Sequence, residues 1–456
     1  MIKDDKMTEL QGKVFGDYIR KTIRSKKIYD RARMSLTGGV SGHARLFQPY
    51  PLYMTRGKGS KIWDADSNEY IDCFLNAGAL LLGHCHPEVM EVTRQETEKG
   101  LLIYNSDLSV RCAELLREVI PCAERVRFAN TGTEAVMFAV RCVRAFTGKN
   151  KVIKFYGHYH GQDDQFLIGI STNENDVISL GVPLDTLKNT VLLRYGCIDD
   201  VVRKLDEDED IAGIILEPQM NMGGIFPASK EYLKELTRLT KERGIPLIFD
   251  EVITGFRLSL GGAQEYFGVI PDLACYSKSI AGGAKFAALV GKEEIMDRLI
   301  PSGFSAYRGE EKSVFQSGTY NDGIEGMAGA LAAIKIYKRM SEQGEYKKLH
   351  ERAAKLAKAI ELSFKERGIG CHVNQLGPSL KIFLTNLEPS FETYSKLDRS
   401  VLYLFFLSQI NEGIILSWPS SGGIFLSFAH TDEDIEKIIE AVNISLENYK
   451  FEEIYE

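Results

Sequence analysis

The stretch Pro246-Leu-Ile-Phe-Asp250-Glu-Val-Ile-Thr-Gly-Phe-Arg257, followed by Pro271-Asp-Leu-Ala-Cys-Tyr-Ser-Lys278-Ser-Ile-Ala-Gly-Gly283, decides the fold. Each half begins with a short apolar run that is typical of a buried strand, and small or turn-forming residues come just after it. Asp250 ends the first run, and Lys278 follows the second. The two neighbouring strand ends therefore offer a carboxylate and an amine.

This pair of residues matches what pyridoxal phosphate needs from a protein. A lysine can hold the aldehyde of the cofactor as a Schiff base, and an aspartate can keep the pyridine nitrogen protonated so that the ring withdraws electrons. Each residue alone has a simpler explanation, because Asp-Glu after a strand is often a helix start and a lysine beside glycines is often a solvated loop residue. Together and in this order, Asp250 and Lys278 favour a pyridoxal phosphate site.

The length and composition of the chain are those of a globular enzyme. The 456 residues exceed the size at which one hydrophobic core stops growing, so we expect one large domain and a smaller companion. Hydrophobic residues make up 44% and charged residues 26%, and no apolar run approaches the ~20 residues of a membrane helix. We therefore expect a soluble protein without membrane association.

Charge and cysteine usage argue against several other classes of function. The net charge of −7 opposes a general affinity for nucleic acid. The polar start, Met1 to Lys13, contains acidic residues and no apolar core, so it resembles neither a secretory signal nor a transit peptide, and we expect a cytoplasmic location. The eight cysteines form no CxxC pair, and the adjacent His84, Cys85 and His86 cannot all converge on one ion, so no metal site is expected.

Alternating helix and strand patterns predict an α/β fold with a mainly parallel central sheet. A helix over 14–33 and a β-rich segment over 52–71 precede this region. The strands expected in the sheet are 125–129, 151–155, 211–216, 246–249 and 273–276, and the helices are 88–99, 110–119, 133–146 and 230–242.

After a helical segment expected over 324–339, the last part of the chain has the pattern of a smaller α+β domain. Helices are expected there over 345–365, 403–411 and 431–446, with strand-like runs at 380–384, 414–417 and 424–429. The predicted organisation is an N-terminal segment at 1–86 that belongs to the small domain, a large cofactor-binding domain at 87–335, and a C-terminal small domain at 336–456.

Three further segments could contact the cofactor. Asn130-Thr-Gly132-Thr133-Glu-Ala135 follows a strand and opens a helix, so its backbone amides predict a phosphate cradle, although an ordinary threonine cap would leave the same pattern. Tyr159 also follows a strand, where its ring could stack on a flat cofactor. The run from Gln316 to Tyr320 offers a second glycine and hydroxyl pair at Thr319, which capping alone explains nearly as well.

The order of these motifs resembles the class III aminotransferases of fold type I. It includes Gly132-Thr-Glu-Ala135, Tyr159-His-Gly161, Glu217-Pro218, the stretch from Asp250 to Arg257 and the following Lys278. Within that family it is most similar to the glutamate-1-semialdehyde 2,1-aminomutases, through Gly38-Gly-Val40 with Arg45, Leu82 to Pro87, and Asn411-Glu-Gly413 with Ala429-His430. The resemblance covers residues 35 to 445.

The resemblance implies a role for each candidate site residue. Lys278 would hold the cofactor and then move the proton from the substrate Cα, while Asp250 would pair with the pyridine nitrogen. It also implies a homodimer with shared sites. The other implied roles are phosphate binding by Gly132 and Thr133, a phosphate contact from the partner subunit by Thr319, packing on the two ring faces by Tyr159 and Val252, support of the polar network by Glu217, and binding of the substrate carboxylate by Arg45.

Several positions differ from the aminomutase pattern. An asparagine-serine-proline run is replaced by Ser41-Gly-His43, a tryptophan near the substrate by Ala77, a glutamate by Gly422, and a serine-glycine-asparagine-proline run by Asn321-Asp-Gly-Ile324. The sequence thus favours an aminotransferase that acts between a small amino acid or amine and a keto acid or aldehyde. The alternative is an aminomutase or an amino acid epimerase. A cofactor-binding protein without catalysis is disfavoured because Lys278 and Asp250 are both present.

Overall fold

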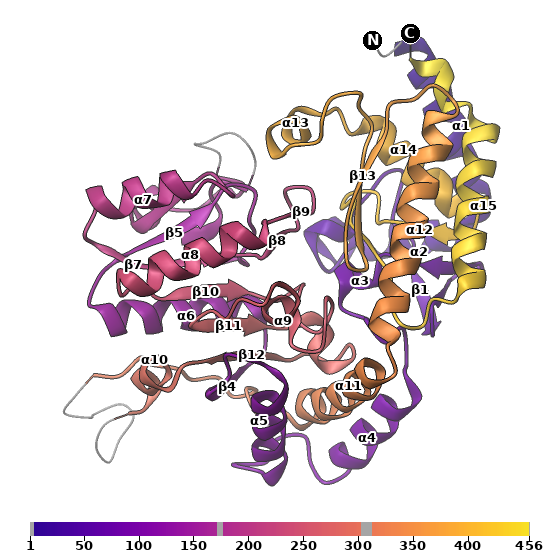
Figure 1. Cartoon of the computed structure of the whole chain (residues 1–456). Coiled ribbons are helices and arrows are strands. Elements are labelled where there is room, and N and C mark those ends of the chain that lie inside the picture. The colour runs from indigo at the N-terminus through magenta and orange to yellow at the C-terminus, as the bar shows by residue number, and fades with distance from the viewer. Residues whose placement is uncertain (1–3, 171–176, 302–311, 456) are drawn as a thin grey trace. The chain divides into compact units, whose positions relative to one another are not determined.

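The structure is a computed structural model that describes residues 4–170, 177–301 and 312–455. Its contacts divide the chain into a central unit, Pro87–Tyr346, and a terminal unit that combines Met1–His86 with Lys347–Glu456. Figure 1 shows the course of the chain through each unit. The sequence predicts domain boundaries after residues 86 and 335. These boundaries, taken as the limits of functional domains, stay a prediction.

A seven-stranded sheet forms the core of the central unit, in the order β4-β12-β11-β10-β7-β5-β6. Neighbouring strands run parallel except for β12, which is antiparallel to both β11 and β4. The predicted α/β architecture is confirmed, whereas β6 and β12 were not predicted. The strands are β4 (Arg125–Ala129), β5 (Lys151–Phe155), β6 (Thr190–Leu193), β7 (Ile211–Leu216), β10 (Leu247–Asp250), β11 (Leu273–Tyr276) and β12 (Ala287–Gly291).

The middle strands are almost entirely apolar because both faces of the sheet are covered. Every residue of β7, β10, β11 and β12 is buried, and α6 packs against β7, β11 and β12. Burying one such aliphatic side chain contributes roughly 1.5–3 kcal/mol. The helices of this unit are α4 (Pro87–Thr97), α5 (Asp107–Val119), α6 (Gly132–Thr147), α7 (Ile198–Glu207), α8 (Lys230–Glu242), α9 (Gly262–Phe267), α10 (Glu293–Met296) and α11 (Ile324–Glu342), and a small hairpin joins β8 (Gln219–Met220) to β9 (Phe226–Pro227).

The terminal unit is built from both ends of the chain. Its larger sheet has the order β1-β2-β3-β15, in which β3 and β15 pair in parallel with Ile71 opposite Ile414. Helix α14 packs against α1 and α15. The strands are β1 (Met54–Lys58), β2 (Lys61–Asp64), β3 (Glu69–Asp72), β13 (His372–Leu376), β14 (Ser379–Phe383), β15 (Ile414–Ile415) and β16 (Ile424–Phe425), and the helices are α1 (Asp4–Lys21), α2 (Ile23–Ala32), α3 (Leu75–Gly78), α12 (Glu345–Lys365), α13 (Phe391–Lys396), α14 (Ser400–Asn411) and α15 (Asp432–Tyr449).

The single helix predicted over 14–33 is wrong, because the chain breaks at Thr22 between α1 and α2. Thr22 has φ −128° and ψ 39°, which is not helical. Its hydroxyl lies 2.6 Å from the carbonyl oxygen of Tyr18 and 2.9 Å from the hydroxyl of Tyr50. A short side chain that bonds its own backbone competes with the helix in this way, and helical periodicity alone does not reveal it.

Short helix α3 is left-handed at its core. Leu75, Asn76 and Ala77 have φ values of 50°, 52° and 60°. The carboxylate of Asp72 accepts hydrogen bonds from the backbone N–H groups of Phe74 and Leu75, both at 2.9 Å. Because a left-handed conformation costs roughly 1–2 kcal/mol for each residue with a side chain, this turn is a strained element that its surroundings maintain.

Candidate active site

Three chemically important side chains meet at one edge of the central sheet. Strand β10 ends at Asp250, β7 is followed directly by Glu217, and β11 is followed by Ser277 and Lys278. These strands are parallel neighbours, with Asp250 opposite Cys275 and Phe249 opposite Leu216. The carboxyl ends of such strands are where ligands bind in α/β sheets. The structure therefore places the predicted pair, Asp250 and Lys278, as the sequence suggested.

Asp250 is a buried carboxylate held by a histidine. Its side chain is 5% exposed. One carboxylate oxygen lies 2.8 Å from Nδ1 of His160, and the other accepts a 3.1 Å hydrogen bond from the N–H of Val252. Burial raises the pKa of Asp250 to about 7, although the Val252 N–H and the charge of Lys278 oppose the rise. Burial also lowers the pKa of His160 well below its ordinary value, which favours the neutral imidazole.

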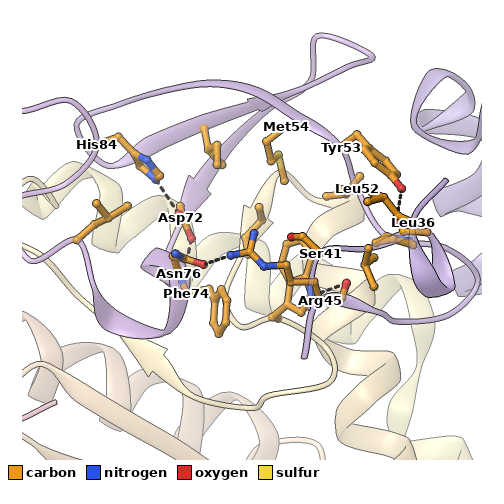
Figure 2. A pocket seen from close by; sticks show the side chains of 17 residues that line it. Leu36, Ser41, Arg45, Leu52, Tyr53, Met54, Asp72, Phe74, Asn76 and His84 are labelled. Carbon is orange, nitrogen blue, oxygen red and sulfur yellow. Dashed lines mark hydrogen bonds and ion pairs between the residues drawn. The ribbon is translucent and has the colours of Figure 1, made fainter. Parts of the chain in front are cut away.

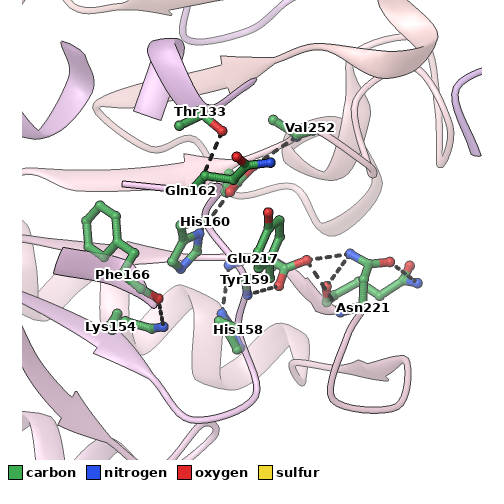
Figure 3. Close-up of polar contacts among 12 residues, drawn as sticks. Thr133, Lys154, His158, Tyr159, His160, Gln162, Phe166, Glu217, Asn221 and Val252 are labelled. Atoms are coloured by element: carbon green, nitrogen blue, oxygen red, sulfur yellow. Dashed lines mark hydrogen bonds and ion pairs between the residues drawn. The ribbon is translucent and has the colours of Figure 1, made fainter. Parts of the chain in front are cut away.

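Glu217 links the strand end to the Tyr159 segment. One of its oxygens accepts the N–H of Tyr159 at 2.8 Å, and the other accepts the side-chain amide of Asn221 at 2.7 Å. Burial raises the pKa of Glu217 to about 7, and the charge of Asp250 adds to the rise. Figure 3 shows these contacts converging on the Glu217 carboxylate. Glu217 thus fixes the backbone from which the Tyr159 ring projects.

Lys278 has a strained backbone and a perturbed amine. Its φ of 48° is left-handed, and it begins the short 3₁₀ helix η5 (Lys278–Ala281). The hydroxyl of Ser277 donates to the carbonyl of Phe286 at 2.9 Å, and that of Ser279 donates to the carbonyl of Gly255 at 2.8 Å, so both flanks are fixed. Burial lowers the pKa of the Lys278 amine to about 8, against the opposing charges of Glu217 and Asp250. Clustered perturbations of this kind are typical of functional sites.

The start of helix α6 forms a tightly packed turn beside Asp250. Thr131 caps the helix in a reciprocal capping box with Glu134, so the ordinary capping interpretation is right for Thr131. A Cβ on Gly132 would lie 2.8 Å from a methyl group of Val252. The hydroxyl of Thr133 accepts the N–H of Gln162 at 3.2 Å. Only a glycine allows this approach, and it leaves the amides at the helix start available to an anion.

Two candidates remain, Thr319 in the central unit and Arg45 in the terminal unit. Thr319 is exposed, in a segment where Asn130 donates to the side chain of Asn321 at 3.0 Å and Gln316 donates to the carbonyl of Phe128 at 2.9 Å. Its role from a partner subunit stays a prediction. Arg45 belongs to the terminal unit, where it lines a cavity (Figure 2) and reaches the side-chain oxygen of Asn76 at 3.5 Å.

The histidine behind Asp250 was missed by the sequence analysis. The Tyr159-His160 motif predicts a role for the tyrosine ring and assigns none to the histidines at positions 158 and 160. His158 accepts the N–H of Glu217 at 2.9 Å, and Lys154 lies fully buried nearby, donating to the carbonyls of Phe166 and Ile168 at 3.0 and 2.7 Å. The sequence does contain a signal for these three buried residues, namely a lysine and two histidines near the end of one apolar strand.

A metal site is not indicated by the side chains described. Within residues 4–170, 177–301 and 312–455, no group of three or more potential ligands could hold an ion. His84 instead pairs with Asp72, with Nε2 2.8 Å from a carboxylate oxygen.

No helix in the described parts of the chain is long and apolar enough to cross a membrane.

The fold and this site define an enzyme of the pyridoxal phosphate class, with fold type I. The model of the family "Aminotransferase class-III" matches residues 43–367. The glutamate-1-semialdehyde 2,1-aminomutase of Archaeoglobus fulgidus is 37% identical over 430 residues, which are 93% of this chain and 100% of that protein. The chain therefore belongs to the class III aminotransferase family, whose members are pyridoxal phosphate-dependent enzymes.

Solved structures agree with this membership. An omega-transaminase from Sphaerobacter thermophilus has a TM-score of 0.84 at 28% identity, covering 93% of this chain and 98% of that one. A transaminase with PLP bound has a TM-score of 0.84 at 27% identity, covering 94% and 98%. The predicted family and the predicted fold type I are confirmed.

Proposed function

We propose that this protein uses pyridoxal phosphate to move an amino group between carbons of one substrate, as an aminomutase does. The meeting of Asp250, Glu217 and Lys278 at one sheet edge carries the cofactor chemistry. The match to an aminomutase over that protein's whole length supports the intramolecular reaction. The sequence favoured transfer between two molecules and gave the aminomutase as its alternative, and the comparisons support the alternative better.

The residues present fit pyridoxal phosphate. Gly132 brings the start of α6 against Val252, where any Cβ would crowd the methyl groups, and this leaves a cradle for a phosphate. Asp250 is a buried carboxylate whose raised pKa shows that it lacks full compensation by a cation. When bound, the cofactor supplies an aldehyde for the amino group and a ring that withdraws electrons.

Asp250 would keep a proton on the pyridine nitrogen. A protonated nitrogen beside this carboxylate offsets the cost of burying its charge, so binding and ionisation favour each other. His160 holds the carboxylate from behind at 2.8 Å and fixes its direction. Val252 and Tyr159 would pack on the two faces of the ring, and Gly132 and Thr133 would hold the phosphate.

Lys278 would hold the cofactor through Nζ and afterwards carry the proton of the substrate. Its pKa of about 8 lies closer to neutral pH than that of an ordinary lysine, which suits a group that both accepts and returns a proton. Glu217 keeps the Tyr159 segment in place, and Arg45 would hold a substrate carboxylate.

Product analysis tests this proposal. The purified holoenzyme is incubated with glutamate-1-semialdehyde and a panel of other amino-carbonyl compounds, with no keto acid added. We expect the isomeric amine to form in at least one case. Turnover that requires a keto acid, with the amino group recovered on that acid, would contradict the intramolecular reaction.

The aminotransferase is the second candidate, and the altered substrate positions favour it. Ala77 and Gly422 stand where the aminomutase pattern has a tryptophan and a glutamate, so a different substrate is expected. An amino donor would then transfer its amino group to the enzyme. A keto acid or aldehyde would take up that group and return the enzyme to its starting form. The homodimer and the cytoplasmic location stay predictions under either function.

A further inference from the structure

The two histidines behind Asp250 contain polar atoms that the proposed reaction does not use. His158 and His160 follow strand β5 and are fully buried. The centroids of their rings lie 5.9 Å apart, with 60° between the ring planes. Nε2 of each ring has no hydrogen-bond partner among the described residues. Buried polar groups are nearly always bonded to protein or to ordered water, so these two nitrogens need an explanation.

A hydrogen bond determines which nitrogen of His158 carries a proton. Burial lowers the pKa of both histidines well below the ordinary value, and the charge of Lys154 adds to the effect, which favours neutral rings. A neutral imidazole has one N–H donor and one bare acceptor nitrogen. Nδ1 of His158 accepts the N–H of Glu217 at 2.9 Å, so the proton lies on Nε2. His158 therefore contributes a buried donor.

His160 contributes the complementary acceptor when Asp250 is ionised. An ionised carboxylate only accepts hydrogen bonds, so its 2.8 Å contact with Nδ1 of His160 requires the proton on that nitrogen. Nε2 of His160 is then bare. The two Nε2 atoms do not bond to each other directly. A buried water molecule, which both accepts and donates, would satisfy the donor of His158 and the acceptor of His160 together.

The neighbours of the two rings hold them in place. The ring of Tyr195 meets His158 edge to face with 4.4 Å between centroids, and Phe166 meets His160 in the same way at 5.7 Å. Lys154 donates to the carbonyl of Phe166 at 3.0 Å and fixes this side of the cluster (Figure 3). Buried polar groups that are held and fully satisfied form rigid networks.

We propose that one internal water joins the two histidines, accepting from Nε2–H of His158 and donating to Nε2 of His160, and that His158 is thereby a positioning residue. This chain of hydrogen bonds keeps the proton of His160 on Nδ1, facing an ionised Asp250. With that proton on Nε2 instead, two donors would face the same water and the acceptor would be lost. The inference deepens the proposed function and rests on it in that Asp250 pairs with the pyridine nitrogen.

Two substitutions of His158 separate its donor from its contact with Glu217. In His158→Gln, the longer side chain places an amide N–H near the position of Nε2, and the acceptor for the N–H of Glu217 is lost. In His158→Asn, the shorter side chain places its oxygen near the position of Nδ1, and the donor is lost. The water-linked chain predicts that glutamine replaces histidine better than asparagine does. A purely structural role of the Glu217 contact predicts the reverse order.

Nitrogen NMR of the holoenzyme with isotope-labelled histidine reports the tautomers directly, with His160→Gln to assign the His160 signals. We expect the proton of His160 on Nδ1 in the wild type and in His158→Gln, and a shift toward Nε2 in His158→Asn. Cofactor affinity and turnover should each fall roughly tenfold in His158→Asn and at most about threefold in His158→Gln, the size of one hydrogen bond. His372→Asn, the same substitution on β13, is the matched control and should leave all three measurements unchanged.

The reverse order of the two His158 variants, or a proton on Nε2 of His160 in the wild type, would overturn the proposal. A crystal structure of the holoenzyme without a water within about 3.2 Å of both Nε2 atoms would overturn it as well. Product analysis tests the proposed function separately. If the tautomers are as expected while the amino group is recovered on an added keto acid, the proposed function fails and the role of His158 survives.

Discussion

Asp250, Glu217 and Lys278 share a physical state as well as a location. Burial moves the pKa of each toward neutrality, to about 7 for both carboxyl groups and about 8 for the amine. Each residue loses the favourable hydration energy of its charge on burial. The opposite charges within the cluster compensate for only part of that loss. A further cation next to Asp250 would therefore offset part of the cost of burying its charge.

Replacing Lys278 by alanine should abolish the covalent attachment of the cofactor and keep the fold. The cradle at α6 and the carboxylate of Asp250 remain, while the amine of Lys278 is removed. Borohydride reduction followed by peptide mapping should find a cofactor adduct on Lys278 in the wild type and none in the variant. Lys285→Ala is the control, since Lys285 is exposed and lies 5.3 Å from the ring centre of Tyr320. An adduct that persists in Lys278→Ala would show that the assignment is wrong.

Asp250→Asn should reduce turnover by roughly 10²-fold or more and weaken cofactor binding much less, because an amide cannot stabilise the protonated nitrogen. Steady-state rates and cofactor titration separate the two effects. Asp272→Asn serves as the control, because Asp272 precedes β11 at the opposite edge of the sheet and pairs with Lys292. Near-normal turnover in Asp250→Asn would remove the role given to this residue.

Lys154 should make stability depend on pH. Burial lowers its pKa from 10.5 to about 7. Between these values the unfolded chain binds more protons than the folded one, so the free energy of unfolding rises with pH, by up to about 1.4 kcal/mol per pH unit. Urea unfolding at about pH 7 and about pH 9 should show a rise in the wild type that is smaller in Lys154→Met. The same rise should persist in Lys151→Met, whose lysine pairs with Asp208 near the surface of the same strand.

At the scale of elements, Gly132 in the first turn of α6 has no room for a side chain. In Gly132→Ala the new methyl group would lie 2.8 Å from Val252, so the turn must shift away from the strand end. We expect cofactor affinity to fall by about tenfold or more, with a small effect on stability, as measured by cofactor titration and thermal unfolding. The double variant Gly132→Ala/Val252→Ala should recover part of the affinity. No recovery would mean that the loss is not steric.

The sequence predicted the elements whose signal is local. The apolar runs that end at Asp250 and Tyr276 indicated both strands because a buried strand needs no partner information to be recognised. Strand β12 has the same kind of apolar run, Ala287 to Gly291, yet its antiparallel pairing with β4 depends on residues about 160 positions earlier in the chain. The His160 to Asp250 contact was missed for the same reason, because it joins the ends of β5 and β10 across the sheet. Short-range periodicity carries no information on such contacts.

At the scale of the whole molecule, an exposed apolar surface supports the predicted homodimer. Leu101 is 67% and Tyr104 97% exposed, and Phe315 and Tyr320 are exposed as well. A 3.0 Å hydrogen bond from the N–H of Ile324 to the carbonyl of Leu101 brings these two segments of the central unit together, next to Thr319. Exposed apolar groups that gather in this way are typical of interaction surfaces.

Replacing both Leu101 and Tyr104 by serine should therefore shift the protein toward monomers, as measured by sedimentation velocity across a dilution series. Activity should fall together with the dimer fraction if Thr319 acts across the interface. The matched control is Leu184→Ser, which removes an apolar side chain that is 73% exposed in another segment. A wild-type protein that is monomeric at all concentrations would exclude the dimer.

During synthesis, the central sheet can form before β3 is able to pair with β15. Every strand of the central sheet lies between Arg125 and Gly291, so that sheet can form once a continuous stretch has left the ribosome. Ile71, in contrast, must wait for Ile414, which at ~5–20 residues per second is a delay on the order of tens of seconds. Throughout that interval one edge of β3 has no partner, and an unpaired strand edge is a template for other chains. The N-terminal segment is therefore open to pairing with other chains until β15 has been made, although in the finished molecule β15 covers that edge of β3.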